Sequence, residues 1–246
     1  MGLDTKLVAA IRDQNYDVWN TDDLNSNRFT SDQNFRHIKR GTWNRLVAWD
    51  LGKLRDPNAM VVFKWCTIET AWENSQRHIN TFRTAIYQVV GIHESHNDYT
   101  IEVQRLQRMV NDGKWSRPIL VFDATGVGVA VEEQVRHLQG FERIVPLQIT
   151  SGTKMETGGK FAIAGKSRLL SELEQVVKQR RIRIPDRQQT DRLARQLTSF
   201  RVEETNRGYR AVDDRREGHH FDLLVALAMG ISFIEYKIDA TFVRII

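Results

Sequence analysis

The stretch at residues 44–52, NRLVAWDLG, is the point around which the chain is organised. Residues 46–49 are apolar and predict a short buried strand that carries the carboxylate of Asp50 at its end. An Asp-Pro-Asn turn at residues 56–58 leads into a second apolar run at residues 59–66, so the two runs predict an antiparallel hairpin. A carboxylate at the end of a buried strand is costly to desolvate unless a partner such as a cation compensates it. The position of Asp50 therefore favours a cation site to which later acids contribute.

The middle of the chain alternates short apolar runs with helical patterns. Strands are predicted at residues 84–93, 118–122 and 144–149, and helices at residues 97–111 and 127–138. Three adjacent strands followed by alternating helices and strands predict an α/β fold with a central mixed sheet. We expect its first three strands to be antiparallel, its later strands to be parallel, and helices to flank it.

The remaining elements follow a Gly-, Ser- and Thr-rich loop at residues 150–160. The pattern predicts helices at residues 164–179, 190–198 and 222–236, a strand at residues 181–184, and an extra hairpin near the C-terminus. Residues 1–40 are polar and poor in core residues, apart from a short amphipathic helix at residues 5–12. We interpret residues 1–40 as an N-terminal arm or interdomain linker and residues 41–246 as the folded domain.

The composition is that of an ordinary globular protein, with 41% hydrophobic and 27% charged residues in a chain of 246. The single cysteine, Cys66, excludes an intrachain disulfide and a cysteine-based zinc site. No apolar stretch approaches the roughly 20 residues that span a bilayer, and we expect no membrane partner. The net charge of +5 favours a polyanionic partner, although a slightly basic solvated surface explains it equally well.

Two later acids resemble Asp50 in their placement. Asp123 also follows four apolar residues at the end of a predicted strand, and Asp222 begins the last apolar helix. Neighbouring strands that end in carboxylates direct them to the same rim of a sheet. Three such acids form an oxygen-only site of the kind that Mg²⁺ or Mn²⁺ prefers, and two such ions can promote phosphodiester hydrolysis. The sequence thus predicts a catalytic metal site at Asp50, Asp123 and Asp222.

Simpler roles compete for each acid. An Asp after a strand is often a turn or cap residue, and this applies to Asp123 before Thr-Gly-Val-Gly and to Asp222 as the N-cap of its own helix. His219 and His220 could act as ligands or as a general base, although solvated loop histidines are the simpler interpretation. Alternative acids for the third position, if the hairpin supplies it, are Asp213, Asp214 and Glu217.

Basic residues gather in the second half of the chain and could bind a phosphate backbone without reading sequence. Among them, Lys160, Lys166 and Arg168 lie in or just after the Gly-rich loop and are the predicted DNA-binding residues. Gly165-Lys166-Ser167 resembles the end of a nucleotide-binding phosphate loop. Lys160 stands where that loop requires its first Gly, however, so an ATP site is not expected.

Several blocks together resemble one family. They are WDLGKLRDPNAMVVF at residues 49–63, ILVFDATGVGVAVEEQV at 119–135, ITSG at 149–152, KSRLL at 166–170, IRIP at 182–185 and HHFDLLVALAMG at 219–230. In this order the chain is similar to the C-terminal nuclease domain of the large terminase subunit of tailed bacteriophages. That resemblance implies an RNase H-like fold, shared with retroviral integrases, and a nuclease that uses Mg²⁺ or Mn²⁺ to cut concatemeric viral DNA during genome packaging.

The resemblance also carries expectations about the site and the partners. It implies that Asp50 and Asp123 bind metal. The family commonly has His-Asp-Asp in the last block, whereas this chain has His220-Phe221-Asp222. Asp222 is therefore the expected third acid, with Asp214, Glu217, His219 and His220 as alternatives or contributors. The implied partners are double-stranded DNA, an upstream ATPase motor domain, the small terminase subunit and the portal, with localisation in the host cell cytoplasm at the procapsid.

The leading hypothesis is accordingly a metal-dependent DNA endonuclease of low sequence specificity that holds two ions at Asp50, Asp123 and Asp222. A Holliday-junction resolvase or recombinase on the same fold is an alternative and would prefer branched DNA. A DNA-binding packaging module without catalysis is a second alternative, in which the acids serve only as caps.

Overall fold

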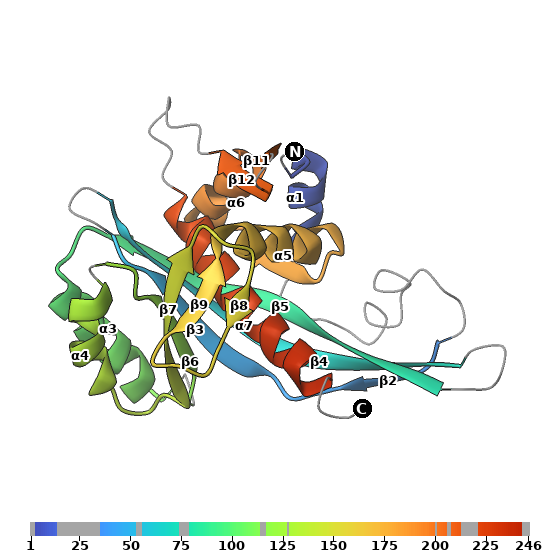
Figure 1. Ribbon diagram of the computed structural model, residues 1–246, viewed down its shortest axis with the longest axis horizontal. Coiled ribbons are helices and arrows are strands. Elements are labelled where there is room, and N and C mark those ends of the chain that lie inside the picture. Colours follow the sequence, from blue (N-terminus) through green and yellow to red (C-terminus); the bar gives the residue numbers. More distant parts are fainter. Residues whose placement is uncertain are drawn as a thin grey trace.

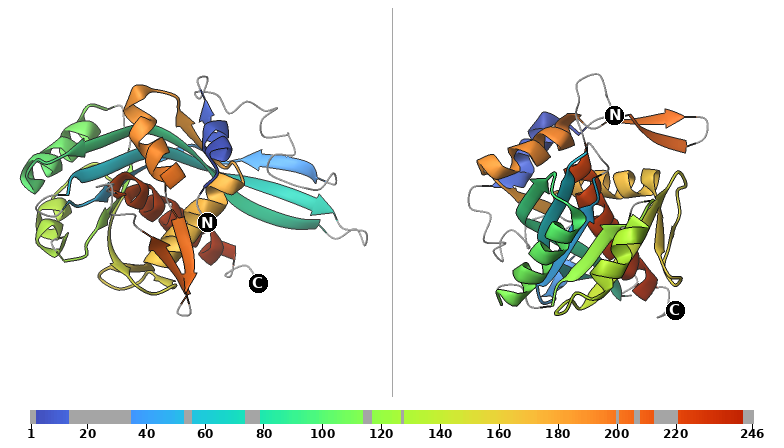
Figure 2. Two further views of the ribbon diagram at one scale, coloured as in Figure 1. Left: turned by 90° about the horizontal axis from the view of Figure 1, so that it is seen from above. Right: turned by 90° about the vertical axis from the view of Figure 1, so that its left-hand side faces the viewer.

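The computed structural model describes most of the chain. The described residues are 3–13, 35–52, 56–73, 79–113, 117–126, 128–199, 201–205, 208–212 and 221–242. Asp213, Asp214, Glu217, His219 and His220 lie outside these ranges. The described part is built on one large mixed β-sheet with helices on both faces, as Figures 1 and 2 show.

The centre of the sheet consists of β3 (Asn44–Asp50), β4 (Asn58–Glu73), β5 (Ile79–Ser95), β6 (Ile119–Asp123) and β7 (Arg143–Thr150). Their spatial order is β5-β4-β3-β6-β7. Strands β3, β4 and β5 pair antiparallel, and strands β3, β6 and β7 pair parallel. The predicted α/β fold with a mixed sheet is therefore confirmed.

Five further strands bring the sheet to ten among the described residues: β1 (Arg12–Asp13), β2 (Phe35–Arg40), β8 (Met155–Glu156), β9 (Ala162–Gly165) and β10 (Ile182–Pro185). Strand β9 runs parallel to β7, and β8 runs antiparallel to β9. At the other edge β10 is parallel to β5, and β1 is parallel to β10. Strand β2 pairs antiparallel with residues 68–72 of β4. The predicted extra hairpin is present as β11 (Arg201–Thr205) and β12 (Gly208–Val212).

The helices divide between the two faces because the strands alternate their apolar side chains. One buried cluster holds Leu46, Val121 and residues of α1 (Thr5–Ile11), α5 (Lys166–Lys178), α6 (Asp191–Ser199) and α7 (Asp222–Phe242). A second cluster holds Val47, Leu120 and residues of α3 (Tyr99–Asn111) and α4 (Gly128–Arg136) on the opposite face. A single turn of 3-10 helix, η1 (Gln188–Thr190), leads into α6. We refer to these faces as the α7 face and the α3 face.

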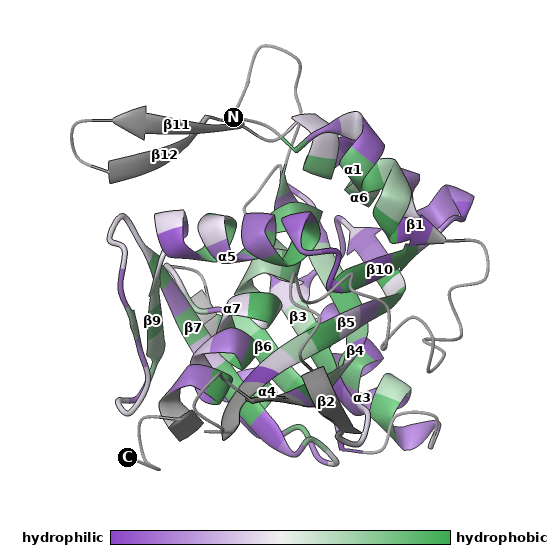
Figure 3. Ribbon diagram, turned by 90° about the vertical axis from the view of Figure 1, so that its right-hand side faces the viewer, coloured by the Kyte–Doolittle hydropathy of each residue, from purple (hydrophilic) through white to green (hydrophobic). Residues whose placement is uncertain are grey.

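Helix α7 is the central helix of the fold. Its residues 223–234 are nearly all apolar and largely buried, and Figure 3 shows hydrophilic residues among hydrophobic ones toward its C-terminal end. It lies against β3, β4 and β5 on one side and against α5 on the other. Gly230 allows this close approach, since a Cβ there would lie 2.6 Å from Phe63 Cζ and 2.8 Å from Leu46 Cδ2. No helix within the described ranges combines the length and apolar character that a membrane crossing requires.

Two features differ from the expectations drawn from the sequence. The helix predicted at residues 164–179 begins only at Lys166, because residues 162–165 pair with β7 as strand β9. Part of the predicted N-terminal arm belongs to the core, since Val8 and Ile11 are each only 2% exposed. Arg12 also forms ion pairs with Asp186 and Asp191 that hold this segment beside α6. The proposed division into an arm and a domain at residue 40 stays a prediction.

Candidate active site

Asp50 and Asp123 end two neighbouring parallel strands. Trp49 of β3 is in register with Phe122 of β6, and each acid is the next residue along its strand. The strand spacing of about 4.8 Å therefore sets the separation of the two backbones at this point. The prediction that the two strand-end acids meet at one rim of the sheet is confirmed for their backbone positions.

Both side chains also face the same side of the sheet. Leu46 and Ala48 on β3, and Ile119 and Val121 on β6, lie in the buried cluster of the α7 face. Because successive side chains of a strand alternate between faces, the next member of both series is an acid, Asp50 in β3 and Asp123 in β6. The two carboxylates thus project toward the layer that contains α7.

Asp123 is only 8% exposed and is built into the turn that follows β6. The backbone N–H of Thr125 donates to Asp123 Oδ1 at 2.8 Å, and the Thr125 hydroxyl accepts from the N–H of Ile149 at 2.8 Å. The turn role considered for Asp123 is therefore real. It does not exclude metal binding, since a carboxylate offers about four lone-pair positions on its two oxygens.

Asp222 is the first helical residue of α7 and lies in the first turn, where a carboxylate complements the helix dipole. It is not the N-cap that one alternative expected. The N–H of Val225 donates to the carbonyl of Phe221, so Phe221 is in the capping position. Phe221 packs against the apolar cluster of the α7 face, which gives an aromatic residue at this position a structural role.

A glutamine from α6 supplies the cap that Phe221 cannot provide. The side-chain oxygen Oε1 of Gln196 accepts the N–H of Leu224 at 2.9 Å, and this bond is buried. An N–H in the first turn of a helix has no partner within the helix, so an external acceptor is needed. Gln196 thereby holds the start of α7, and with it Asp222, against α6.

One acid of the rim was missed in the sequence. Glu94 of β5 pairs with Ala59 of β4, which in turn pairs with Asp50, so the three residues form a row across the sheet. Ile92, two residues earlier, packs on the α7 face, so Glu94 lies on the same face as Asp50. The prediction ended this strand at residue 93. The pattern that predicted Asp50, an acid at the end of an apolar strand, also holds for Glu94 when the strand is extended to Ser95.

Glu94 connects the acidic rim to α6 and, through α6, to the start of α7. Its Oε1 lies 3.2 Å from Nε of Arg192 on α6. Arg192 and Gln196 are four residues apart and occupy one side of that helix. Because Gln196 holds Leu224, helix α6 connects the rim that carries Asp50 to the first turn of α7. The fold therefore brings the element that carries Asp222 to the acidic rim.

Within the ranges given above, no group of three or more His, Cys, Asp or Glu side chains is arranged to hold a metal ion. The hard carboxylate oxygens of Asp50 and Asp123 fit Mg²⁺ or Mn²⁺ in chemical type. The four alternative contributors to the third position, Asp214, Glu217, His219 and His220, lie outside the described residues, so the third ligand stays a prediction.

The three predicted DNA-binding residues lie in different environments. Lys166 is exposed as the first residue of α5, directly after Gly165, and β9 ends there at the same edge of the sheet as the acids. Lys160 Nζ lies 3.1 Å from Glu132 Oε2 of α4, toward the α3 face. Arg168 lies 2.8 Å from Glu172, an ion pair on α5 that leaves it 27% exposed. Lys166 is the only one of the three without an ion pair to a described residue.

A buried network on the α3 face supports the loop after Asp50. Glu102 of α3 has a fully buried side chain that accepts from Ser95 Oγ at 2.7 Å and Asn97 Nδ2 at 2.8 Å, and His93 Nε2 lies 3.1 Å away. Burial raises the pKa of Glu102, but these hydrogen bonds and the charge of His93 outweigh it and lower the pKa overall. His93 thus contributes to a structural network on the α3 face.

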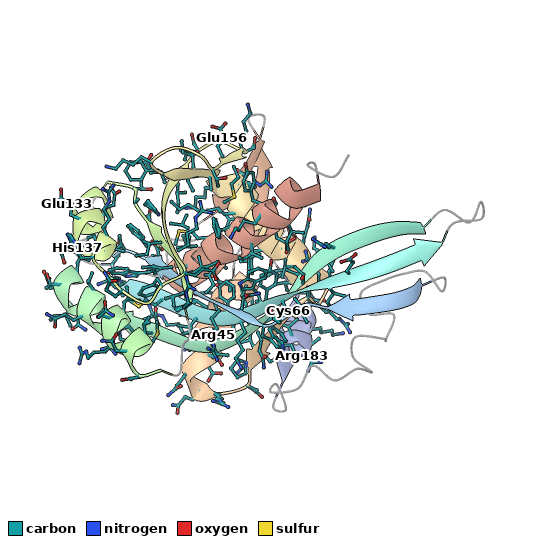
Figure 4. All side chains as sticks on the ribbon, turned by 90° about the horizontal axis from the view of Figure 1, so that it is seen from below. Arg45, Cys66, Glu133, His137, Glu156 and Arg183 are labelled. Atoms are coloured by element: carbon teal, nitrogen blue, oxygen red, sulfur yellow. The ribbon has the colours of Figure 1, made fainter. Side chains whose placement is uncertain are left out.

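The same network reaches the residues next to Asp50. Asn58 donates to the carbonyl of Asn97 at 2.9 Å and accepts from the N–H of Gly52 at 3.3 Å. The Tyr99 hydroxyl donates to the carbonyl of Gly52. The end of β3 is therefore tied through hydrogen bonds to α3. By contrast, Figure 4 shows Glu133 and His137 projecting from α4 at the edge of the molecule.

The chain matches no protein-family model and no curated protein sequence.

Proposed function

We propose that this chain is a divalent-metal-dependent DNA endonuclease with an RNase H-like fold, corresponding to the nuclease domain of a phage large terminase subunit. The observation that carries the proposal is the adjacency of Asp50 and Asp123 at the ends of two parallel strands, on one face. The central sheet, antiparallel from β3 to β5 and parallel from β3 to β7, also supports the proposal. The resemblance of the sequence blocks supports the same family.

The residues of the rim suit this activity. Asp50 and Asp123 are hard oxygen donors on neighbouring strands, and Asp222 begins the helix that lies over their face. Bound Mg²⁺ or Mn²⁺ would activate a water and stabilise the leaving oxygen of a phosphodiester. Lys166, exposed at the same edge, would bind the DNA backbone. The proposal includes the substrate and the partners. The chain would cut concatemeric DNA while acting together with a motor domain, a small subunit and the portal.

Cleavage of plasmid DNA in the presence of Mn²⁺ tests the activity. Asp50→Asn and Asp123→Asn keep the shape of each side chain and remove its charge. Each should lower the cleavage rate by about a hundredfold or more, because metal stabilisation of a transition state is worth several kcal/mol. Asp112→Asn changes an exposed acid at the C-terminal end of α3 and serves as the matched control.

The outcomes separate the alternatives. Folded Asp50→Asn protein that cuts at the wild-type rate would show that the acidic rim is not the active site. Preference for a four-way junction over linear duplex would instead indicate a resolvase. Calorimetric titration with Mn²⁺ gives a second measure, in which both Asn variants should bind the ion more weakly than the control.

A further inference from the structure

Arg192 is positioned to bind phosphate at the acidic rim. Its Nε lies against Glu94, and its side chain remains 46% exposed, whereas that of Glu94 is 17% exposed. A guanidinium has five N–H donors in one plane, so it can hold a carboxylate by one edge and present the other edge to a phosphate. Among the described residues, Arg192 forms no ion pair except the one with Glu94.

Glu94, which pairs with Arg192, lies at a defined distance from Asp50. Glu94 and Asp50 are separated by one strand, with Ala59 between them on the same face, so their backbones are about 10 Å apart. Ala59 itself is fully buried in the cluster of the α7 face. Gln196, one turn further along α6, holds this helix to α7.

The ion pair has the character of a positioning contact. Burial raises the pKa of Glu94, and the nearby charges of Arg192, His93 and His96 act in the opposite direction without cancelling that effect. A carboxylate on a largely buried face requires compensation, and Arg192 supplies it. The charge of Glu94 in turn keeps the guanidinium close to the rim.

We propose that Arg192 binds a backbone phosphate of the DNA strand close to the cleaved bond, and that Glu94 is its positioning residue. This closeness follows because Glu94, which Arg192 contacts, lies only two strand spacings, or about 10 Å, from Asp50. This inference rests on the proposed nuclease function, since it takes Asp50 and Asp123 as the point of cleavage.

Binding of a labelled DNA duplex in EDTA, where no metal-dependent cutting occurs, tests the inference on the full chain. Arg192→Ala should weaken binding about fivefold to tenfold and lower the slope of log K against log salt by about one. Glu94→Gln should weaken binding less, because the arginine remains but loses its ionic anchor. Arg195→Ala changes the next exposed arginine of α6 and should alter affinity less than about twofold.

The result that would overturn the inference is an Arg192→Ala protein that binds DNA like the Arg195→Ala control. If Arg192→Ala does not fold by circular dichroism, Arg192→Lys replaces it; this variant should keep the salt slope and still lose affinity, because it lacks the planar fork. Unchanged affinity in Arg192→Lys would equally count against the proposal. Failure of the nuclease function has a different signature, namely wild-type protein that binds DNA and does not cut it with Mn²⁺.

Discussion

Gly230→Ala tests whether α7 is seated on the sheet as tightly as the structure indicates. The added Cβ would lie 2.6 Å from Phe63 Cζ, 2.7 Å from Phe63 Cε1 and 2.8 Å from Leu46 Cδ2. Carbon atoms in contact are normally about 3.5–4.0 Å apart, so helix and sheet must separate by roughly 1 Å. Phe63 cannot readily turn aside, because it is fully buried and packs edge-on against Tyr87 at 5.9 Å.

The expected loss of stability combines two opposing effects. Overpacking of a buried contact costs about 1–3 kcal/mol. Replacement of a helical Gly by Ala recovers up to about 1 kcal/mol in helix propensity. The free energy of unfolding should therefore fall by about 1–2 kcal/mol. Since α7 also carries Asp222, its displacement should weaken Mn²⁺ binding at the rim.

Urea unfolding measures this change, and a double-mutant cycle identifies its cause. Phe63→Leu removes the two ring atoms nearest to the new Cβ, so Gly230→Ala should cost less in that background than in the wild type. Gly91→Ala is the control, because a Cβ at Gly91 meets nothing within 4 Å, and its effect should stay within about 0.5 kcal/mol. A Gly230→Ala protein as stable as the wild type, or one whose cost is unchanged by Phe63→Leu, would refute this account of the packing.

Two further predictions concern buried hydrogen bonds. Gln196→Leu removes the acceptor for the N–H of Leu224 and should lower the free energy of unfolding by about 1–3 kcal/mol; an unchanged urea midpoint would show that another group caps α7. Glu102→Gln should be destabilising by about 1–3 kcal/mol at neutral pH. Because the pKa of Glu102 is lowered in the folded state, its contribution is present above its ordinary pKa of about 4.3 and is lost as the pH falls through the lowered value. The difference between wild type and Glu102→Gln in urea unfolding should thus shrink below about pH 4; a constant difference would contradict the assignment.

Much of the site could be predicted because its signals are local. Residues 46–49 and 119–122 are short apolar runs, each followed directly by an acid, and the Asp-Pro-Asn turn predicts the hairpin of β3 and β4. Period and turn chemistry require no knowledge of distant residues, so these elements and the placement of Asp50 and Asp123 at the ends of their strands could be predicted. The missed strand β9 shows the limit, since Ala-Ile-Ala-Gly runs directly into a strong helical pattern and only its pairing with β7 makes it a strand.

What the sequence determined by itself was the class of the fold and the two acids at the strand ends, because each depends on a few consecutive residues. Only the tertiary structure decided that Glu94 belongs to the same row as Asp50, that Gln196 caps α7 in place of Phe221, and that Lys160 pairs with Glu132. Each of these contacts joins residues at least 28 positions apart. Register between strands and packing between helices bring such residues together, and neither leaves a periodic trace along the chain.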